Sequence, residues 1–206
     1  MLRLSDVSIA RAQRVLLENV SFELSSGEAL IVTGPNGLGK TTLLRTIAGL
    51  QPLYAGSIEA DEDALGYAGH ATAIKPSLSV LENLMFWATL YGREAHLGQT
   101  LEQFNLTTLK AMMAGQLSAG QERRLSLARL FLTGRDIWIL DEPTVSLDRS
   151  SVAELSEILK NHLTAGGAAL IVTHADGLDL GGMERQLDLS PFQTRAKRVT
   201  TDEAFL

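Results

Sequence analysis

The sequence predicts an α/β fold with a mostly parallel sheet, antiparallel strands at the N-terminus and an inserted helical subdomain. Apolar residues alternate near the N-terminus, at residues 2–9 and 20–24, as in half-buried antiparallel strands. Continuously apolar runs at residues 29–34, 137–140 and 168–173 are typical of strands buried on both faces of a parallel sheet. Helical patterns separate these runs, so we expect crossover connections between the strands.

The remaining elements of the core follow from turn and capping residues. SSGE at residues 25–28 is a turn, and a helix is expected over residues 40–48. Short strands are expected at residues 55–61 and 65–67. A helix over residues 121–132 should precede the next buried strand.

Capping patterns place two further helices. Ser79 and Glu82 have the spacing of a capping box, which predicts a helix that runs to Gly92. Because strand patterns are missing from this region, we expect a helical subdomain at about residues 71–116, inserted in a single domain of residues 1–206. Ser151 and Glu154 have the same capping spacing, so a last helix should start near Ser151.

Composition excludes several classes of protein. The sequence has no cysteine, so disulfides and thiolate metal sites are excluded. Apolar runs approaching the ~20 residues of a membrane helix, or resembling a signal peptide, are missing, which predicts a cytoplasmic protein. The net charge of −6 disfavours nucleic acid as a partner.

GPNGLGKT at residues 34–41 matches the pattern of a phosphate-binding loop. Its glycines let backbone N–H groups surround a β-phosphate, Lys40 would reach the β- and γ-phosphates, and the Thr41 hydroxyl would bind Mg²⁺. The alternative is a chance glycine-rich turn, but the strand before the loop and the helix after it favour phosphate binding. The expected nucleotide-binding residues of this loop are Gly34, Pro35, Asn36, Gly37, Leu38, Gly39, Lys40, Thr41 and Thr42.

Two strand ends carry candidate catalytic residues. Asp141 ends the apolar run IWILD and could hold Mg²⁺, and Glu142 could polarise the attacking water. Such carboxylates also commonly just meet solvent, but their place downstream of a phosphate loop favours catalysis. His174 follows the run ALIVT, and ligands bind at the carboxyl ends of parallel strands. We therefore expect His174 to contact the γ-phosphate, although a structural role is the alternative.

A second Ser-Gly turn opens the helix after LSAGQ at residues 117–121. Ser118 could simply cap this helix, but a helix N-terminus with a hydroxyl and Gly120 is also an anion site. Since the first loop already surrounds one side of a nucleotide, Ser118 and Gly120 would then serve ATP held by another copy of the chain.

These motifs, in this order, resemble those of the ATP-binding cassette (ABC) ATPases. LSAGQ resembles the signature motif, the segment Ser146-Leu147-Asp148 the D-loop, and His174 the switch histidine. The resemblance covers almost the whole chain. It implies a head-to-tail dimer with two ATP molecules, each with Mg²⁺, between the phosphate loop of one copy and the signature serine of the other.

Two positions depart from the family pattern. Arg11 stands where the family usually has an aromatic residue that stacks on adenine, and its guanidinium could stack there instead. His70 replaces the usual glutamine at the start of the helical subdomain. Since Mg²⁺ prefers oxygen ligands, we expect His70 to hydrogen-bond the attacking water or a metal-bound water.

The segment GHATAIKPSLSVLENLMFWATLYG is similar to the ATP-binding subunit of the cytochrome c maturation system, described as a heme exporter. This resemblance implies an energy-coupling ATPase on the cytoplasmic face of the inner membrane, beside integral membrane permease subunits. An ATPase for another small-cargo exporter is one alternative, and a soluble ABC ATPase acting on ribosomes or DNA is another. The apolar run Leu84, Met85, Phe86 and Trp87 would either contact the membrane subunits or pack on the core.

Overall fold

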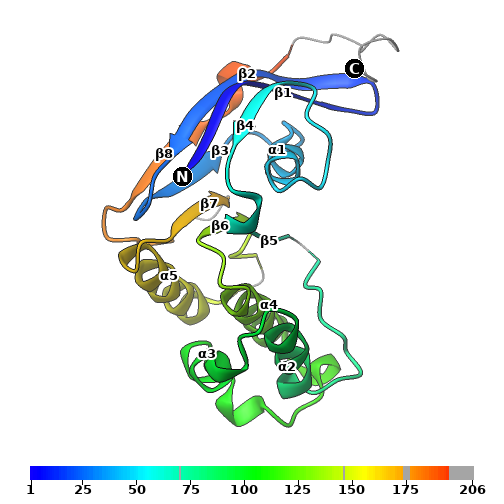
Figure 1. The fold of residues 1–206 in the computed structure, drawn as a ribbon, viewed down its shortest axis with the longest axis vertical. Helices are drawn as coiled ribbons and strands as arrows, with labels where there is room; N and C mark the ends of the chain where they lie inside the picture. Colours follow the sequence, from blue (N-terminus) through cyan, green and yellow to red (C-terminus); the bar gives the residue numbers. More distant parts are fainter. Residues whose placement is uncertain (70, 146, 174–176, 195–206) are drawn as a thin grey trace.

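The computed structural model describes residues 1–69, 71–145, 147–173 and 177–194, and it has the predicted α/β fold. Eight strands form two sheets in the described residues, a three-stranded sheet of order β2-β1-β4 and a five-stranded sheet of order β5-β6-β7-β3-β8 (Figure 1). The strands are β1 (Leu2–Arg11), β2 (Arg14–Leu24), β3 (Ala29–Thr33), β4 (Ala55–Glu59), β5 (Leu65–Ala68), β6 (Ile137–Asp141), β7 (Ala168–Val172) and β8 (Glu184–Asp188). The helices are α1 (Lys40–Ile47), α2 (Val80–Leu90), α3 (Leu97–Gln103), α4 (Ala119–Leu132) and α5 (Arg149–Thr164).

The three-stranded sheet confirms the antiparallel prediction. β1 and β2 pair from Leu2↔Leu24 to Arg11↔Arg14, and β4 pairs on the other edge of β1. β2 therefore begins well before the run at residues 20–24 that indicated it. The strands expected at residues 55–61 and 65–67 both form, but they join different sheets, β4 this one and β5 the parallel one.

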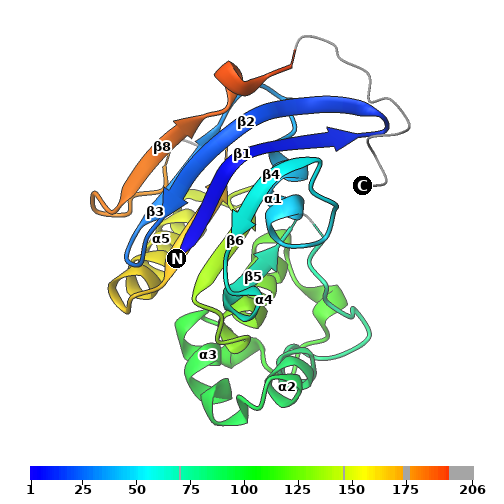
Figure 2. The same cartoon turned by 45° about the horizontal axis from the view of Figure 1, so that its top comes forward.

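The five-stranded sheet is parallel throughout, and its central strands are buried on both faces. Side chains of β6 alternate between two cores, as strand geometry requires. Ile137 and Ile139 pack with α1 and the antiparallel sheet, whereas Trp138 and Leu140 pack with α4 and α5. Figure 2 shows the resulting layers, with the antiparallel sheet and α1 on one side of the parallel sheet and the helices on the other.

The helices begin at caps that the sequence only partly predicts. Ser79 and Glu82 form the expected capping box at α2, where Glu82 N donates to Ser79 Oγ at 3.2 Å. The cap expected at Ser151 is wrong. α5 begins at Arg149 and is capped by Asp148, whose Oδ1 accepts from Ser151 N at 2.8 Å. An Asp that accepts from the amide three residues later is as good a cap as Ser.

α2 and α3 lie between β5 and β6 in the chain, and both pack against α4 at the end of the molecule away from the antiparallel sheet (Figure 1). Short 3₁₀ turns connect them, among them Glu94–His96, Thr107–Leu109 and Ala114–Gln116. Within the described residues, each helix is too short or too polar to cross a membrane.

Candidate functional site

The phosphate-loop residues join β3 to α1, as the sequence predicts for such a loop. Gly34 and Gly39 have φ values of 141° and 114°, which only glycine adopts without strain. A Cβ on Gly34 would lie 2.6 Å from Leu38 Cδ2, so this position also excludes a side chain. Gly39 occupies the N-cap of α1 without a side-chain cap, so the first amides of α1 remain available to an anion.

Lys40, the first residue of α1, is buried within this loop. Its Nζ donates to Gly34 O at 2.7 Å and to Pro35 O at 3.0 Å. Burial lowers the pKa of Lys40, while the nearby charges of Glu142 and Asp141 act in the opposite direction. The ammonium group is thus held among carbonyls, near the carboxylates of Asp141 and Glu142 at the end of β6.

Thr41 and Asp141, the two expected Mg²⁺ ligands, are in direct contact. Thr41 Oγ1 donates to Asp141 Oδ1 at 3.1 Å, and the Tyr67 hydroxyl donates to Asp141 Oδ2 at 3.5 Å. Burial, followed by the charge of Asp141, raises the pKa of Tyr67. A hydroxyl and a carboxylate are hard oxygen donors, so this pair fits Mg²⁺. The described residues hold no cluster of three or more acidic, histidine or cysteine ligands, so phosphate and water would complete the coordination.

Glu142 lies on the same cavity as the phosphate loop. This cavity, of about 310 Å³, is lined by Arg11, Leu16, Asn36, Gly37, Gly39, Lys40, Thr41, Thr42, Glu142 and Val172. Glu142 has a φ of 51° in the left-handed region, and its N–H donates to Val172 O at 2.8 Å. A glutamate held in this conformation is strained, a condition found often at functional sites. Arg11, the last residue of β1, also lines this cavity and so lies near the phosphate loop.

Ser118 and Gly120 lie at the start of α4 and do not line this cavity. Ser118 caps α4, because its Oγ accepts a hydrogen bond from Gln121 N at 3.3 Å. The Ser118 residue is exposed. A Cβ on Gly120 would lie 3.8 Å from both Leu147 Cδ2 and Ser151 Oγ, so the signature residues lie beside the D-loop segment. The sites expected at His70, Ser146 and His174 fall outside the described residues.

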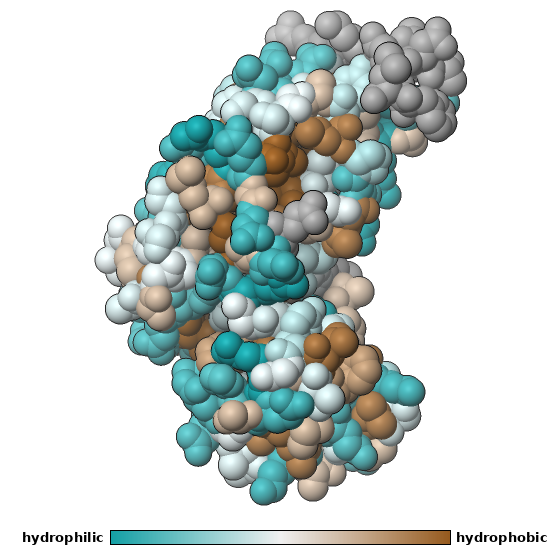
Figure 3. Space-filling view, viewed as in Figure 1, coloured by the Kyte–Doolittle hydropathy of each residue, from teal (hydrophilic) through white to brown (hydrophobic). Residues whose placement is uncertain are grey.

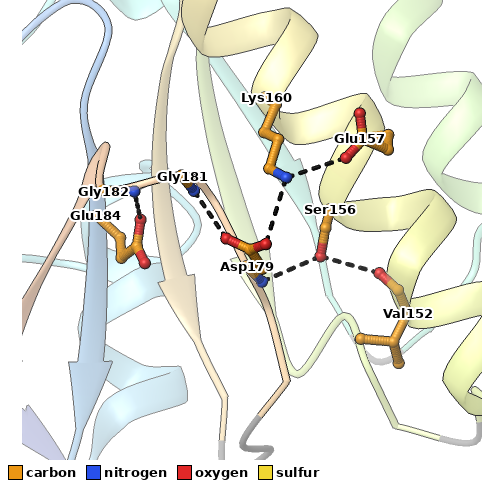
Figure 4. Close-up of polar contacts among 8 residues, drawn as sticks. All are labelled: Val152, Ser156, Glu157, Lys160, Asp179, Gly181, Gly182 and Glu184. Atoms are coloured by element: carbon orange, nitrogen blue, oxygen red, sulfur yellow. Dashed lines mark hydrogen bonds and ion pairs between the residues drawn. The ribbon is translucent and has the colours of Figure 1, made fainter.

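Polar contacts hold the segment of residues 177–184, which follows β7, against α5 (Figure 4). Asp179 N donates to Ser156 Oγ at 3.3 Å, and Lys160 Nζ lies 3.6 Å from Asp179 Oδ2 and 3.0 Å from Glu157 Oε1. The hydrogen bond from Gly181 N, followed by the charge of Lys160, lowers the pKa of Asp179. α5 begins at the D-loop segment, so these contacts connect it to the chain after β7.

Arg123 is a residue of this site that the sequence did not reveal. It comes from α4, is 6% exposed, and donates to carbonyls at the ends of β5 and β6. The doubled arginine in QERR was the only available signal, and a polar pair on a helix usually indicates a solvated face.

Comparison with known proteins identifies the family of this chain. The sequence pattern of the ABC transporter family matches residues 17–145. The cytochrome c biogenesis ATP-binding export protein CcmA of Ruegeria pomeroyi is 54% identical over 94% of this chain and 93% of its own, and that of Paracoccus denitrificans is 52% identical over 96% and 93%.

Solved structures show the same fold. A putative ABC transporter ATP-binding protein from Pyrococcus furiosus has a TM-score of 0.81 at 26% identity and covers 94% of this chain and 99% of its own. A dimeric ATP-binding cassette in a post-hydrolysis state, bound to ADP and Pi, has a TM-score of 0.80 at 22% identity over 97% and 99%. The resemblance read from the motifs is therefore confirmed, and the chain belongs to the ABC transporter family as an ATP-hydrolysing, ATP-binding subunit.

Proposed function

We propose that this chain is the ATP-hydrolysing subunit of an export complex that acts in cytochrome c biogenesis. The observation that carries the proposal is the cavity shared by Lys40, Thr41 and Glu142, in a chain 54% identical to a cytochrome c biogenesis ATP-binding export protein. The residues of the cavity support ATP hydrolysis, and the similarity to these relatives supports a role in cytochrome c biogenesis.

The residues of the cavity suit hydrolysis of ATP. The loop amides and Lys40 would bind the phosphates, and the carboxylate of Glu142, which lines the same cavity, would accept a proton from the attacking water. Thr41 and Asp141 would hold Mg²⁺, which when bound neutralises charge on the β- and γ-phosphates. Arg11, at the edge of the cavity, offers a planar guanidinium on which adenine can stack. His174 and His70 are proposed to contact the γ-phosphate and a water near it.

The composite site requires a second copy of the chain. Ser118 and Gly120 are outside the Lys40 cavity, but Ser118 is exposed at the N-terminal end of a fourteen-residue helix. A helix start with an exposed hydroxyl favours an anion. We therefore propose a head-to-tail dimer in which Ser118 and Gly120 of one copy contact the ATP bound by Lys40 of the other.

The helical subdomain is the proposed contact for the membrane subunits. The apolar run of residues 84–87 has an inward-facing and an outward-facing pair. Leu84 is 1% exposed, and Trp87 packs under the guanidinium of Arg129, which lies 4.8 Å from the ring centre. Met85 and Phe86 are exposed, at 42% and 59%. The large exposed hydrophobic side chains of this region are Met85, Phe86, Leu90, Tyr91, Met112 and Met113. Figure 3 shows apolar side chains gathered over this end of the molecule.

This exposed apolar surface favours a protein partner over a free-standing enzyme. Membrane subunits docked there would place the chain on the cytoplasmic face of the membrane, where ATP is available. The net charge of −6 remains an argument against nucleic acid as the partner.

Complementation tests the proposal. A Paracoccus denitrificans strain that lacks its 52% identical relative would be supplied with this chain or with Glu142→Gln. We expect heme-stained c-type cytochromes to return with the unaltered chain and not with the variant. Co-purification with membrane proteins but no return of cytochromes would indicate another exporter. Recovery with ribosomes or DNA and no membrane protein would indicate the soluble class.

A further inference from the structure

The Arg123 side chain binds four backbone carbonyls from two strand ends. Nη1 donates to Gly69 O at 2.9 Å, and Nη2 donates to Asp141 O at 3.2 Å and to Glu142 O at 3.1 Å. Nε donates to Pro143 O at 3.2 Å. One buried guanidinium from α4 thus donates to three consecutive carbonyls at the point where β6 ends.

These carbonyls face Arg123 because of the backbone around Glu142. The Glu142 N–H donates to Val172 O, and its φ of 51° turns the chain away from the strand direction. A non-glycine residue holds a left-handed conformation only where its surroundings enforce it. The Arg123 guanidinium is placed to enforce it here, since its planar fork binds the carbonyls on both sides of the Glu142 Cα.

The fourth carbonyl belongs to the segment that leads to His70. β5 is the edge strand of the parallel sheet, so one side of it has no strand neighbour. α4 supplies donors there, because Arg129 Nη2 donates to Tyr67 O at 3.3 Å and Arg123 to Gly69 O. Thr72 Oγ1 also donates to Glu122 Oε1 at 2.8 Å. α4 therefore contacts this segment at three places, through Glu122 and Arg123 in its first half and through Arg129 near its end.

We propose that Arg123 is a positioning residue for hydrolysis, which holds the Glu142 turn and the end of β5 to the signature helix α4. Arg123 does not line the cavity with Lys40, so its effect is through Glu142 and not through contact with ATP. The proposal rests on the proposed role of Glu142. It implies that a shift of α4, whose N-terminus would contact the nucleotide of the other copy, is transmitted to Glu142 through one side chain.

The test compares Arg123→Lys and Arg123→Gln with Arg129→Lys. Lysine keeps the charge but lacks the fork that reaches both strand ends, and glutamine keeps hydrogen bonding without charge. Arg129 is the matched control, since it is a half-buried arginine of the same helix that donates to a β5 carbonyl but does not touch the Glu142 turn. Each protein is assayed in the assembled complex for steady-state kcat and KM, and as the full chain for ATP affinity and ATP-dependent dimerisation.

We expect both Arg123 variants to bind ATP within about twofold of the unaltered chain and to lose about a hundredfold in kcat, the scale expected from a 1 Å displacement of a catalytic group. They should also accumulate the ATP-bound dimer, as Glu142→Gln should. Arg129→Lys should keep kcat within about twofold of the unaltered chain, even if its melting temperature falls as much as those of the Arg123 variants.

Three results would overturn the proposal: unaltered kcat in both Arg123 variants, a parallel loss of ATP affinity, or failure to accumulate the dimer. Failure of both Arg123 variants to fold would assign the arginine to the scaffold, and would overturn it as well. Glu142→Gln is assayed alongside to separate the two ideas. If that variant hydrolyses ATP normally, the role of Glu142 is wrong, whereas an inactive Glu142→Gln with an active Arg123→Lys refutes only the positioning role.

Discussion

Replacing Lys40 by methionine should weaken ATP binding without weakening the fold. Two of the three N–H donors of Nζ are already bonded to Gly34 O and Pro35 O, which leaves one for a phosphate oxygen. A hydrogen bond involving a charged group contributes roughly 1.5–3 kcal/mol, which corresponds to an increase of about tenfold to 150-fold in Kd. Isothermal titration with Mg·ATP would measure it.

The stability of the nucleotide-free protein should not fall when Lys40 is replaced by methionine. Burial lowers the pKa of Lys40, so below that pKa the fold disfavours the protonated side chain relative to the unfolded chain. Removing the charge should therefore leave the melting temperature unchanged or raise it at neutral pH. Lys160→Met is the matched control, because ion pairing raises the pKa of Lys160 and the lysine is outside the cavity. Its Kd should be unaltered and its melting temperature should not rise.

The reasoning on Lys40 would be refuted by a Kd within about twofold of the unaltered chain. It would also be refuted by a melting temperature that falls together with the affinity, since that pattern would assign Lys40 to the scaffold.

Three further outcomes are expected. A mixture of Ser118-defective and Lys40-defective chains should recover ATPase activity in at most one of the two composite sites, as measured by phosphate release. Full activity in a lone Ser118-defective monomer would contradict the proposed dimer. Phe86→Ser should reduce co-purification with membrane subunits and leave melting nearly unchanged, whereas Leu84→Ser, at a position 1% exposed, should lower the melting temperature strongly; equal behaviour would contradict the proposed contact surface. Asp179→Asn should lower the stability of the protein to urea at neutral pH. Because the pKa of Asp179 is lowered in the folded protein, its carboxylate stabilises the fold above about pH 4, and this stabilisation is lost at lower pH. The difference in stability between the variant and the unaltered chain should therefore shrink below about pH 4.

Much of the fold was readable because local and long-range signals agree. The apolar runs of β3, β6 and β7 are buried on both faces, and the loop after β3 needs the glycines that the sequence provides. Alternation at Val15 and Leu17 also belongs to β2, but the tight turn after Arg11 carries no glycine or proline to mark it. Residues Ala12 and Gln13 make this turn with positive φ, which sequence patterns rarely indicate.

Other features depend on contacts that a single sequence does not reveal. Asp148 and Ser151 are both plausible N-cap residues in the sequence, and the structure shows that Asp148 caps α5. Nothing local distinguishes β4 from β5, yet they pair in different sheets. Arg123 resembles any helical arginine, and its importance comes from carbonyls 18, 19, 20 and 54 residues away in the chain.

The most direct test of the central claim is the steady-state ATPase rate of the assembled complex with Glu142→Gln. The substitution keeps the shape of the side chain and removes the carboxylate that would accept the proton from water. We expect ATP affinity within about twofold of the unaltered chain, an ATP-bound dimer that persists, and a kcat reduced by about a hundredfold or more, as loss of general-base catalysis predicts. A variant that binds ATP and still hydrolyses it at the rate of the unaltered chain would show that the base is elsewhere and would contradict the account.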